Sequence, residues 1–580
     1  MANNNQYLMI FLTFFLDLCL IYGKSSAVGE IGTTTESQQM VNVGVILDLD
    51  TPVGKMAHRC ISMAITDFYA RNANYRTKLN LTVKDSGNDV VSAASAALEL
   101  LNNEEVQAII GPQTSNQAKF VINLGEKAQI PIISFSATSP SLSLNRFFIR
   151  TALDDSYQVK AITSIVQAYG WREVVLIYED TEYGNGLIPY ILDAFQQIDT
   201  RVPYRSVISP SSSRLNILRK LNKLMAMQTR VFLVHMTASL GSKLFVLAKE
   251  AGMISEGYAW IITDGLSSML HPEEGMVIDS MEGVVGVTPY VPMSTGLKDF
   301  EMRWKRKLHS IPSKMSVFGL WAYDTVWALA KAVELVEFQA NYSGALKKYN
   351  KGKSASGILG QIDVSKSGPR LLQTLLSTRF EGLSGEFRLI DKQFQPVAFK
   401  IFNVISKRET VIGYWTPNKE TFGDLVQSGI LTNYSSTSTS MVGHREFIIK
   451  PPIWPGNTRS PPKGWVIPIT GKKLRIGVPV TAESLNTFMK IEWYPDTNEP
   501  KSFSGFSYDV FLAALERMPF ALPHKFIPFT NCSSREPAGT YDDLLYQIKL
   551  NKFDAVVGDT TIISNRTSYV DLHYLILNQE

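Results

Sequence analysis

The stretch VQAIIGPQTSNQAKFVINLGEKAQIPIISFSATSPS, residues 106–141, decides the fold that the sequence predicts. Two apolar runs, residues 106–110 and 130–135, flank a segment with helical spacing at residues 117–128. Apolar runs separated by helices are typical of buried parallel strands, and ligands of open parallel sheets bind beyond the strands' carboxyl ends. Small hydroxyl residues follow both runs, next to the unpaired N–H groups of helix starts. This edge is therefore expected to bind a small polar ligand rather than to transform one.

The same hydroxyl residues have an ordinary alternative role. Ser and Thr in front of a helix commonly cap its first turn, so neither Ser115 nor Thr138 alone indicates a site. The binding interpretation depends on two such turns, from neighbouring strands, converging at one sheet edge.

Composition limits the class of protein. A chain of 580 residues with 45% hydrophobic and 19% charged residues predicts two or three ordinary folded domains. A formal net charge of +4 without a long basic block argues against nucleic acid as a partner. Residues 1–27 combine a short apolar run with small residues and predict a signal peptide, the alternative being a membrane anchor. No later stretch has the roughly 20 apolar residues that a membrane span needs.

Cysteines and sequons fit a secretory route. Cys19 lies in the predicted signal, which leaves Cys60 and Cys532 in different predicted domains and provides no disulfide framework. Cys60 lies on the apolar face of a predicted helix and is expected to be a buried free thiol. Possible glycosylation sites are Asn80, Asn341, Asn433, Asn531 and Asn565.

Strand and helix patterns alternate along most of the chain. They predict one α/β lobe up to about residue 147, a crossing strand at residues 147–151, and a second α/β lobe after it. Within the second lobe, a helix is expected at residues 187–197 and a strand at residues 260–264. Two such lobes would form a clamshell with a ligand cleft between them. The expected domains are a clamshell at residues 41–421, a proline-punctuated linker at 422–472 and a second binding unit at 473–580.

Polar residues at the second lobe's strand ends are expected to face the cleft. Glu179, Asp180 and Tyr183 follow one strand, and Asp264 follows another. A carboxylate from one lobe, with hydroxyls and helix N-termini from the other, would match the two ends of an α-amino acid. The alternative is that Asp264-Gly265 forms only a turn.

Several of these segments resemble a known family. Ile109-Ile110-Gly111-Pro112, residues 130–139, Thr181-Glu182-Tyr183-Gly184 and residues 260–264 are similar to periplasmic-binding proteins of type I, the leucine-binding fold that also forms the amino-terminal domain of glutamate receptors. The resemblance implies that Ser115 and Thr138 bind the α-carboxylate and amine of an amino acid, that Tyr183 packs against it, and that Asp264 binds the amine. In ionotropic relatives this domain often serves assembly instead.

The second unit carries its own pattern. Its strands and helices end in Thr561, which can donate a hydroxyl, and Arg566, which can pair with a carboxylate; a cap and a solvated charge are the alternatives. Residues 453–456, 505–511, 541–544 and 553–566 resemble the first ligand-binding segment of plant glutamate-receptor-like channels, whose fold is of the periplasmic-binding-protein type II. The resemblance implies Arg566 and Thr561 for the ligand's α-carboxylate, the Asp559 carbonyl for its amine, and Phe503 lining the cleft.

A complete member of that family is expected to continue into pore helices, a second ligand-binding segment and a final membrane helix. The resemblance ends at Tyr569-Val570-Asp571, so we expect this chain to lack the pore and most of the other lobe of its second unit. That unit should then be marginally stable because an apolar face is left uncovered.

Two functions follow from the resemblance. The first is the extracellular amino-acid-binding portion of a plasma-membrane, glutamate-receptor-like cation channel, with other receptor subunits as partners, in a homo- or hetero-tetramer. The alternative is a secreted amino-acid-binding protein or decoy subunit. An enzyme is not expected, because the sequence has no complete Walker loop, G-x-S-x-G elbow, HExxH motif, paired CxxC or histidine cluster, and no cofactor or metal is implied.

Overall fold

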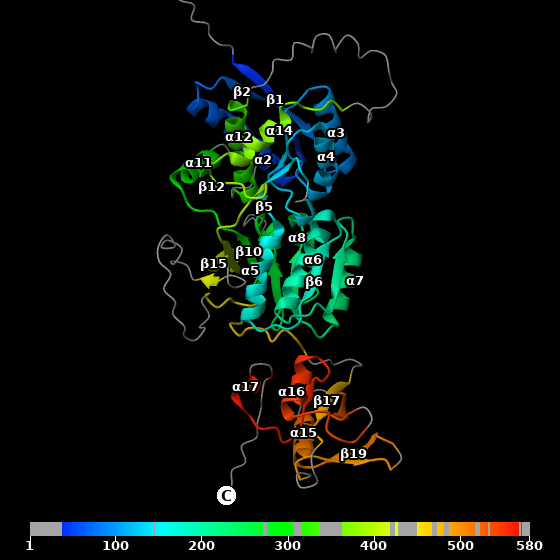
Figure 1. Cartoon of the computed structure of the whole chain (residues 1–580). Coiled ribbons are helices and arrows are strands. Elements are labelled where there is room, and N and C mark those ends of the chain that lie inside the picture. Colours follow the sequence, from blue (N-terminus) through cyan, green and yellow to red (C-terminus); the bar gives the residue numbers. More distant parts are fainter. Residues whose placement is uncertain are drawn as a thin grey trace, which may run out of the picture.

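The computed structural model describes residues 38–142, 145–270, 275–306, 315–336, 362–417, 424–426, 449–466, 473–480, 487–495, 497–516, 522–531, 534–567 and 570. The predicted signal peptide, Cys19, Cys532 and the sequons at Asn341 and Asn433 lie outside the described residues. Three α/β bodies follow one another in Figure 1: a first lobe, a second lobe and a C-terminal unit.

The first lobe is built on a parallel sheet of six strands in the order β13-β5-β4-β3-β1-β2. Its strands are β1 (Gln39–Leu47), β2 (Thr77–Asp85), β3 (Ala108–Ile110), β4 (Ile132–Ser134), β5 (Phe148–Leu153) and β13 (Gln393–Phe394). Its helices are α2 (Pro52–Arg71), α3 (Val90–Asn102), α4 (Ser115–Ala128), the 3₁₀ turn η1 (Pro140–Leu142), α11 (Thr295–Arg306), α12 (Val317–Glu334) and α14 (Gly368–Ser377). A short hairpin, β11 (Phe380–Glu381) and β12 (Glu386–Phe387), joins them.

Alternation along β1 explains why helices cover both faces of this sheet. Val43 and Val45 pack in one core with α2 and α12, whereas Ile46 points to the opposite face and packs with α3 and α4. A strand buried on both faces must be apolar at every position, which is why the sheet reads as continuous apolar runs. On α2, Cys60 is buried as a free thiol, as predicted, and burial raises its pKa.

The second lobe holds a sheet of eight strands in the order β16-β15-β14-β10-β9-β8-β6-β7. Its strands are β6 (Val175–Glu179), β7 (Arg205–Ile208), β8 (Val231–His235), β9 (Ala259–Ile262), β10 (Val285–Pro289), β14 (Phe399–Ile405), β15 (Arg408–Thr416) and β16 (Asp424–Val426). Its helices are α5 (Asp155–Ala168), α6 (Glu182–Gln197), α7 (Arg214–Met225), α8 (Ala238–Glu250), α9 (Asp264–Ser267) and α10 (Gly275–Asp279). The strands from β7 to β10 are parallel, and β14, β15 and β16 add an antiparallel edge.

Two elements of this lobe differ from the sequence prediction. The helix expected at residues 187–197 begins at Glu182, because Thr181 caps it by accepting the N–H of Gly184 at 3.2 Å. A side chain at Gly184 would collide with the carbonyl of Glu179 at 1.8 Å, so the glycine allows the helix to start close to its strand. The strand expected at residues 260–264 ends at Ile262, and Asp264 begins α9 instead of a turn.

The chain after β16 returns to the second lobe before it reaches the C-terminal unit. Trp454 is 1% exposed and packs edge-on against Tyr169 and Trp171, and the Trp171 indole donates to the carbonyl of Pro462 at 2.7 Å. Asn403 accepts the N–H of Ile453 at 2.8 Å. Residues 449–466 of the expected linker are therefore packed against the clamshell.

The C-terminal unit has a three-stranded parallel sheet, β20-β17-β21, and a separate hairpin, β18-β19. Its elements are β17 (Leu474–Val478), β18 (Lys490–Trp493), β19 (Pro500–Ser504), α15 (Phe506–Glu516), β20 (His524–Pro528), α16 (Tyr541–Lys549), β21 (Ala555–Val556) and α17 (Ser564–Thr567). Its alternating strands and helices match the predicted α/β pattern.

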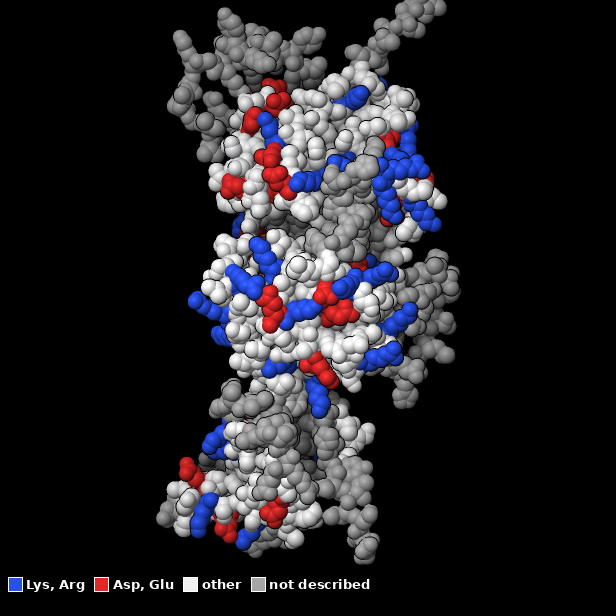
Figure 2. All heavy atoms as spheres, turned by 180° about the vertical axis from the view of Figure 1, so that it is seen from behind, with Lys and Arg blue, Asp and Glu red and all other residues white. Residues whose placement is uncertain are grey.

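Charges on the surface are mixed. Figure 2 shows Lys and Arg side chains interleaved with Asp and Glu over both lobes on the face opposite to Figure 1. The described residues of this face form no uniformly basic surface, as the small net charge predicted.

Candidate functional site

The four residues predicted for the clamshell cleft all lie at strand ends that face the other lobe. Ser115 begins α4 after β3, and Thr138 follows β4, both in the first lobe. Tyr183 lies in the first turn of α6 after β6, and Asp264 begins α9 after β9, both in the second lobe. Both sheets therefore direct their carboxyl ends at one region, where ligands of parallel sheets bind.

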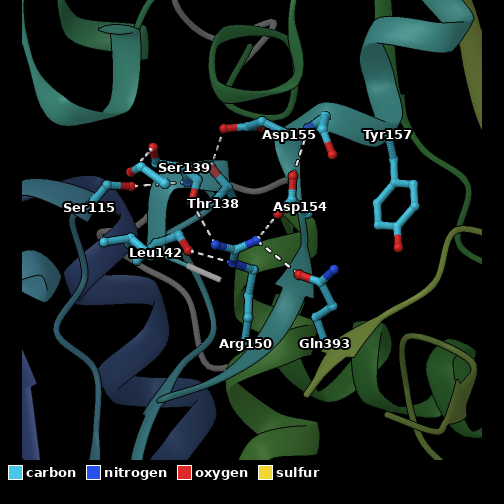
Figure 3. A network of polar contacts seen from close by, with 12 residues as sticks. Ser115, Thr138, Ser139, Leu142, Arg150, Asp154, Asp155, Tyr157 and Gln393 are labelled. Carbon is cyan, nitrogen blue, oxygen red and sulfur yellow. Dashed lines mark hydrogen bonds and ion pairs between the residues drawn. The ribbon is translucent and has the colours of Figure 1, made fainter. Parts of the chain in front are cut away.

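The first-lobe hydroxyls are not helix caps. Thr114 performs that task for α4, with a capping box that it shares with Gln117. Ser115 Oγ instead accepts the N–H of Ser139 at 3.2 Å, and Thr138 Oγ1 donates to Asp155 Oδ2 at 2.7 Å (Figure 3). The capping alternative is thus wrong for both residues, and the two turns converge as expected.

A buried arginine organises the crossing between the lobes. Arg150 on β5 is 1% exposed and donates to the carbonyls of Ala137 and Ser139 at 3.0 and 2.6 Å, to Gln393 at 3.1 Å and to the carboxylate of Asp154 (Figure 3). A buried charge is tolerated when its donors are satisfied in this way. Arg150 therefore fixes the turn that carries Thr138 and the start of α5.

Two carboxylates of the second lobe are linked by one glutamine. Gln158 Nε2 donates to Asp155 Oδ1 at 2.6 Å, and Gln158 Oε1 accepts the backbone N–H of Asp264 at 2.7 Å. Ser268 Oγ donates to the Asp264 carboxylate. Asp155 and Asp264 are each 3% exposed, so the site presents two buried acids side by side with a shared amide.

Tyr183 packs on a histidine behind the site. Its ring centroid lies 4.3 Å from that of His235, whose Nε2 lies 3.1 Å from the Tyr183 carbonyl and whose Nδ1 lies 2.9 Å from Thr263 Oγ1. The Tyr183 hydroxyl is buried without a hydrogen-bond partner. A Cβ added to Gly265 would lie 2.0 Å from this oxygen, so the hydroxyl contacts the first turn of α9 beside Asp264.

Burial controls the ionisation of these groups. It raises the pKa of Asp264 to about 7 and that of Asp155 well above its usual range, with the charge of Asp264 adding to the second effect. It also raises the pKa of Tyr183, helped by Asp155 and Asp264, and lowers that of His235 to about 4. His235 is consequently neutral at pH 7, and the pKa of Asp264 lies close to that pH.

The lobes touch beside the site. Glu182, the first residue of α6, donates its N–H to Asn116 at 2.6 Å and accepts Lys119 Nζ at 2.7 Å and Ser141 Oγ at 2.7 Å. Its carbonyl accepts Ser139 Oγ at 3.0 Å. The two lobes are therefore held together along this side of the site.

Arg150, Asp155 and Gln158 were not predicted from the sequence. Asp154-Asp155 directly follows a buried strand, the same signal that identified Ser115 and Thr138, and could have been found by that rule. The carboxylate of Glu179, by contrast, holds the start of α8. It accepts hydrogen bonds from the Thr237 N–H at 3.0 Å and from the Thr237 hydroxyl at 2.7 Å.

The predicted residues of the C-terminal unit occupy one end of its sheet. Arg566 is 9% exposed, donates from Nε to Asp542 at 2.5 Å and from Nη1 to the carbonyl of Thr561 at 2.6 Å. Asp559 accepts the hydroxyl of Tyr541 at 2.7 Å, and the Thr561 side chain is exposed.

Phe503 belongs to an aromatic cluster of the same unit. Its ring lies 5.2 Å from that of Phe526 and packs on the core that covers β17. The structure thus gathers Asp559, Thr561 and Arg566, while Phe503 contributes to packing.

Comparison with known proteins matches the clamshell to a family. The model of the receptor family ligand binding region matches residues 56–407, well over half of the chain. The chain belongs to this family. It is a family of receptors and binding proteins rather than of enzymes, as the sequence predicted.

Relatives in plants extend the match along the chain. Glutamate receptor 2.8 of Arabidopsis thaliana is 42% identical over 581 residues, which cover 98% of this chain and 57% of that protein. Glutamate receptor 2.3 of the same plant is 41% identical over 576 residues, covering 99% of this chain and 62% of that protein. The chain is a homologue of plant glutamate receptors and spans about 60% of the length of these two relatives.

The fold also matches a solved binding protein. The leucine-binding protein LivK of Thermotoga maritima superposes with a TM-score of 0.52 at 18% identity, covering 65% of this chain and 99% of that protein. The predicted type I periplasmic-binding-protein fold is confirmed. Among the described residues, no helix is long and apolar enough to cross a membrane, and no group of His, Cys, Asp and Glu could hold a metal ion.

Proposed function

We propose that this chain is the extracellular amino-acid-binding portion of a glutamate-receptor-like, ligand-gated cation channel. The observation that carries the proposal is the meeting of Thr138 from the first lobe with the Asp155–Gln158–Asp264 group of the second lobe. Hydroxyls and helix N–H groups on one side and buried carboxylates on the other are complementary to the carboxylate and ammonium of an amino acid.

Each lobe would bind one end of the ligand. Ser115 and Thr138 would hold the α-carboxylate at the start of α4, Asp264 would hold the ammonium, and Tyr183 would pack against the ligand. In the closed clamshell Thr138 donates to Asp155, so a ligand carboxylate competes with Asp155 for that hydroxyl. A ligand that binds the closed state better than the open state would shift the receptor between states.

The C-terminal unit would supply half of a second site. Arg566 and Thr561 would bind an α-carboxylate, and the Asp559 carbonyl would take the amine. The support is that all three lie beyond the carboxyl end of β21, with Asp542 and Thr561 holding the guanidinium in place. The second site would be completed by a lobe outside the described residues.

The cellular setting is part of the proposal, and similarity to plant glutamate receptors supports it. The receptor would pass through the secretory pathway to the plasma membrane and assemble with other receptor subunits. Asn80, Asn531 and Asn565, which are exposed in the structure, are the glycosylation sites that such a route would use.

A thermal-shift screen of the full chain against the twenty standard amino acids tests the proposal. A ligand that binds only the folded state raises the melting temperature, by an amount that grows with its concentration. We expect at least one amino acid to do so in the wild type and not in Asp264→Ala. Asp193→Ala, which changes an exposed acid on α6, is the matched control and should keep the shift. The absence of any shift would contradict the proposal.

A further inference from the structure

The charge balance inside the cleft bears on which ligands it accepts. Besides the paired Asp154, the elements that enclose the site contribute three buried carboxylates: Asp155 on α5, Asp264 on α9, and Glu179 at the end of β6. Glu179 is held by Thr237, whereas Asp155 and Asp264 have neutral donors in Thr138, Gln158 and Ser268.

The described basic groups around these acids are already engaged or neutral. The described hydrogen bonds of Arg150 go to two backbone carbonyls, the Gln393 amide oxygen and the Asp154 carboxylate. His235 is buried, and its ring nitrogens face Thr263 and the Tyr183 carbonyl. Lys400 affects the pKa of Asp264 less than burial and the Ser268 hydrogen bond do. The Lys400 Nζ lies 3.9 Å from the Glu409 carboxylate.

An unpartnered hydroxyl marks where a ligand group fits. Tyr183 Oη is buried beside the first turn of α9 and makes no hydrogen bond of 3.5 Å or less in the closed clamshell, although the Thr263 side chain is close enough to lower the Tyr183 pKa. Buried polar atoms are nearly always hydrogen-bonded, so this oxygen calls for a group that donates to it. An ammonium between Tyr183 Oη and Asp264 would satisfy the hydroxyl and neutralise the acid together.

We propose that the cleft selects amino acids with neutral or cationic side chains and excludes those with a second carboxylate. The inference rests on the function proposed above. A neutral amino acid brings one ammonium to Asp264 and one carboxylate to Ser115 and Thr138. A dicarboxylic amino acid adds a buried negative charge next to Asp155, for which the described residues provide no uncommitted cation, and an unpaired buried charge is strongly disfavoured.

Isothermal titration calorimetry of the full chain with glutamine and glutamate tests the selectivity, because the two ligands differ mainly in one charge. We expect glutamine to bind at least tenfold more tightly than glutamate at pH 7.5. Asparagine and aspartate form a second matched pair with the same expected order. If neither amide binds, the best-binding neutral amino acid from the thermal-shift screen takes its place in the comparison with glutamate and aspartate.

A charge-neutralising variant ties the selectivity to the site. Asp155→Asn should reduce the preference for glutamine severalfold, because it removes one of the buried acids that disfavour an added carboxylate in the cleft, whereas Asp193→Asn should leave it unchanged. Unfolding of each variant is measured to confirm that it folds. Glutamate bound as tightly as glutamine would overturn the inference while leaving the proposed function intact. Binding of no amino acid at all would overturn both.

Discussion

The clamshell and the C-terminal unit use the same strand–helix alternation but bury very different cores. In the clamshell both faces of each sheet are covered by helices, and apolar side chains such as Val43 and Ile46 are fully buried on opposite faces. In the C-terminal unit the described buried cluster has six residues: Leu474, Ile476, Val478, Met489, Leu522 and Phe526. Buried apolar residues of the unit outside this cluster are Leu544, Leu545, Phe553 and Val570. Large apolar side chains there, including Phe488, Ile562 and Ile563, are about 40% exposed.

Charged groups show the same contrast. Arg150 in the clamshell is 1% exposed and has four acceptors, whereas the Arg475–Asp554 pair in the C-terminal unit has exposed fractions of 42% and 23%. A polar network becomes strong and specific only where surrounding layers exclude water. The clamshell therefore has the water-excluding layers that a preorganised binding site needs, whereas the described part of the C-terminal unit forms one side of such a site.

The largest expected effect comes from the arginine that joins the lobes. Arg150→Met should lower the free energy of unfolding by about 3–5 kcal/mol, because the buried charge of Asp154 loses the guanidinium that neutralises it. Urea unfolding followed by circular dichroism measures the change. Arg214→Met, which breaks an exposed pair with Glu250, is the control and should cost no more than about 1 kcal/mol. Equal losses of unfolding free energy in the two variants would show that the buried Arg150 network adds no more stability than an exposed ion pair.

The connector offers a test of where the clamshell ends. Trp454→Ala should destabilise the clamshell by about 3 kcal/mol, because it removes a fully buried ring from the contact with Tyr169 and Trp171. Trp465→Ala, at a half-exposed position in the same stretch, should cost well under about 1 kcal/mol. The unfolding midpoint of the clamshell measures both, and an unchanged midpoint in Trp454→Ala would assign this stretch to a free linker.

The acids of the cleft should make clamshell stability depend on pH. The pKa of Asp264 is about 7 in the folded state and about 4 in an unfolded chain, so folding takes up a proton between these values. Stability contributed by the neutral acid is therefore complete below about pH 4 and is lost as the pH rises through 7.

Asp264→Asn removes this loss. Between pH 4 and pH 8 the unfolding free energy of Asp264→Asn should rise relative to that of the wild type by about 2 kcal/mol. This is roughly half of the largest change that a shift of about three pKa units allows. His235 titrates oppositely but is present in both chains, so it cancels in the difference. Urea titrations at each pH measure the difference, and a constant value would contradict the assignment of a raised pKa to Asp264.

The smallest expected effect concerns the contact between the two regions. Lys549 lies 3.1 Å from Asp199, Arg201 donates to the Leu550 carbonyl at 3.0 Å, and Asn551 donates to Glu173 at 2.5 Å. Asp199 is 73% exposed, so the Lys549–Asp199 pair should be worth at most about 1 kcal/mol.

A double-mutant cycle on Lys549→Ala and Asp199→Ala, read out by limited proteolysis of the C-terminal unit, measures this coupling. We also expect the C-terminal unit to be cleaved before the clamshell, because of its small core. Cleavage of both regions at the same rate would show that the smaller core does not make the C-terminal unit less stable than the clamshell.

Sequence patterns predicted the fold where burial is complete. Residues 106–110 and 130–135 became β3 and β4, because strands covered on both faces must be apolar throughout. Short strands such as β7 and the hairpin β18–β19 were missed, since four or five partly exposed residues give too short a pattern to stand out, even though polar and apolar residues alternate in β18. The early start of α6 was missed because Gly184 and Gly186 mark a loop locally, whereas packing against Glu179 and Ser139 makes glycine necessary there.

The candidate site was predicted only in part, from the positions of residues at strand ends. Strand-end position identified Ser115, Thr138, Tyr183 and Asp264, and the structure brings them to one region. Spacing along the chain could not predict that Asp155 occupies the Thr138 hydroxyl, because this contact joins the two lobes. It also could not predict that Gln158 joins the two acids, because Gln158 and Asp264 are 106 residues apart in the chain.

One measurement tests the central claim, that the clamshell cleft is the amino-acid site of this chain. Calorimetric titration of the full chain with the amino acid that gives the largest thermal shift is compared in the wild type, Asp264→Ala and Arg566→Ala. The account predicts that binding is lost in Asp264→Ala and retained in Arg566→Ala, because the described part of the C-terminal unit provides one side of a site. Binding that survives in Asp264→Ala and disappears in Arg566→Ala would contradict the account and place recognition in the C-terminal unit.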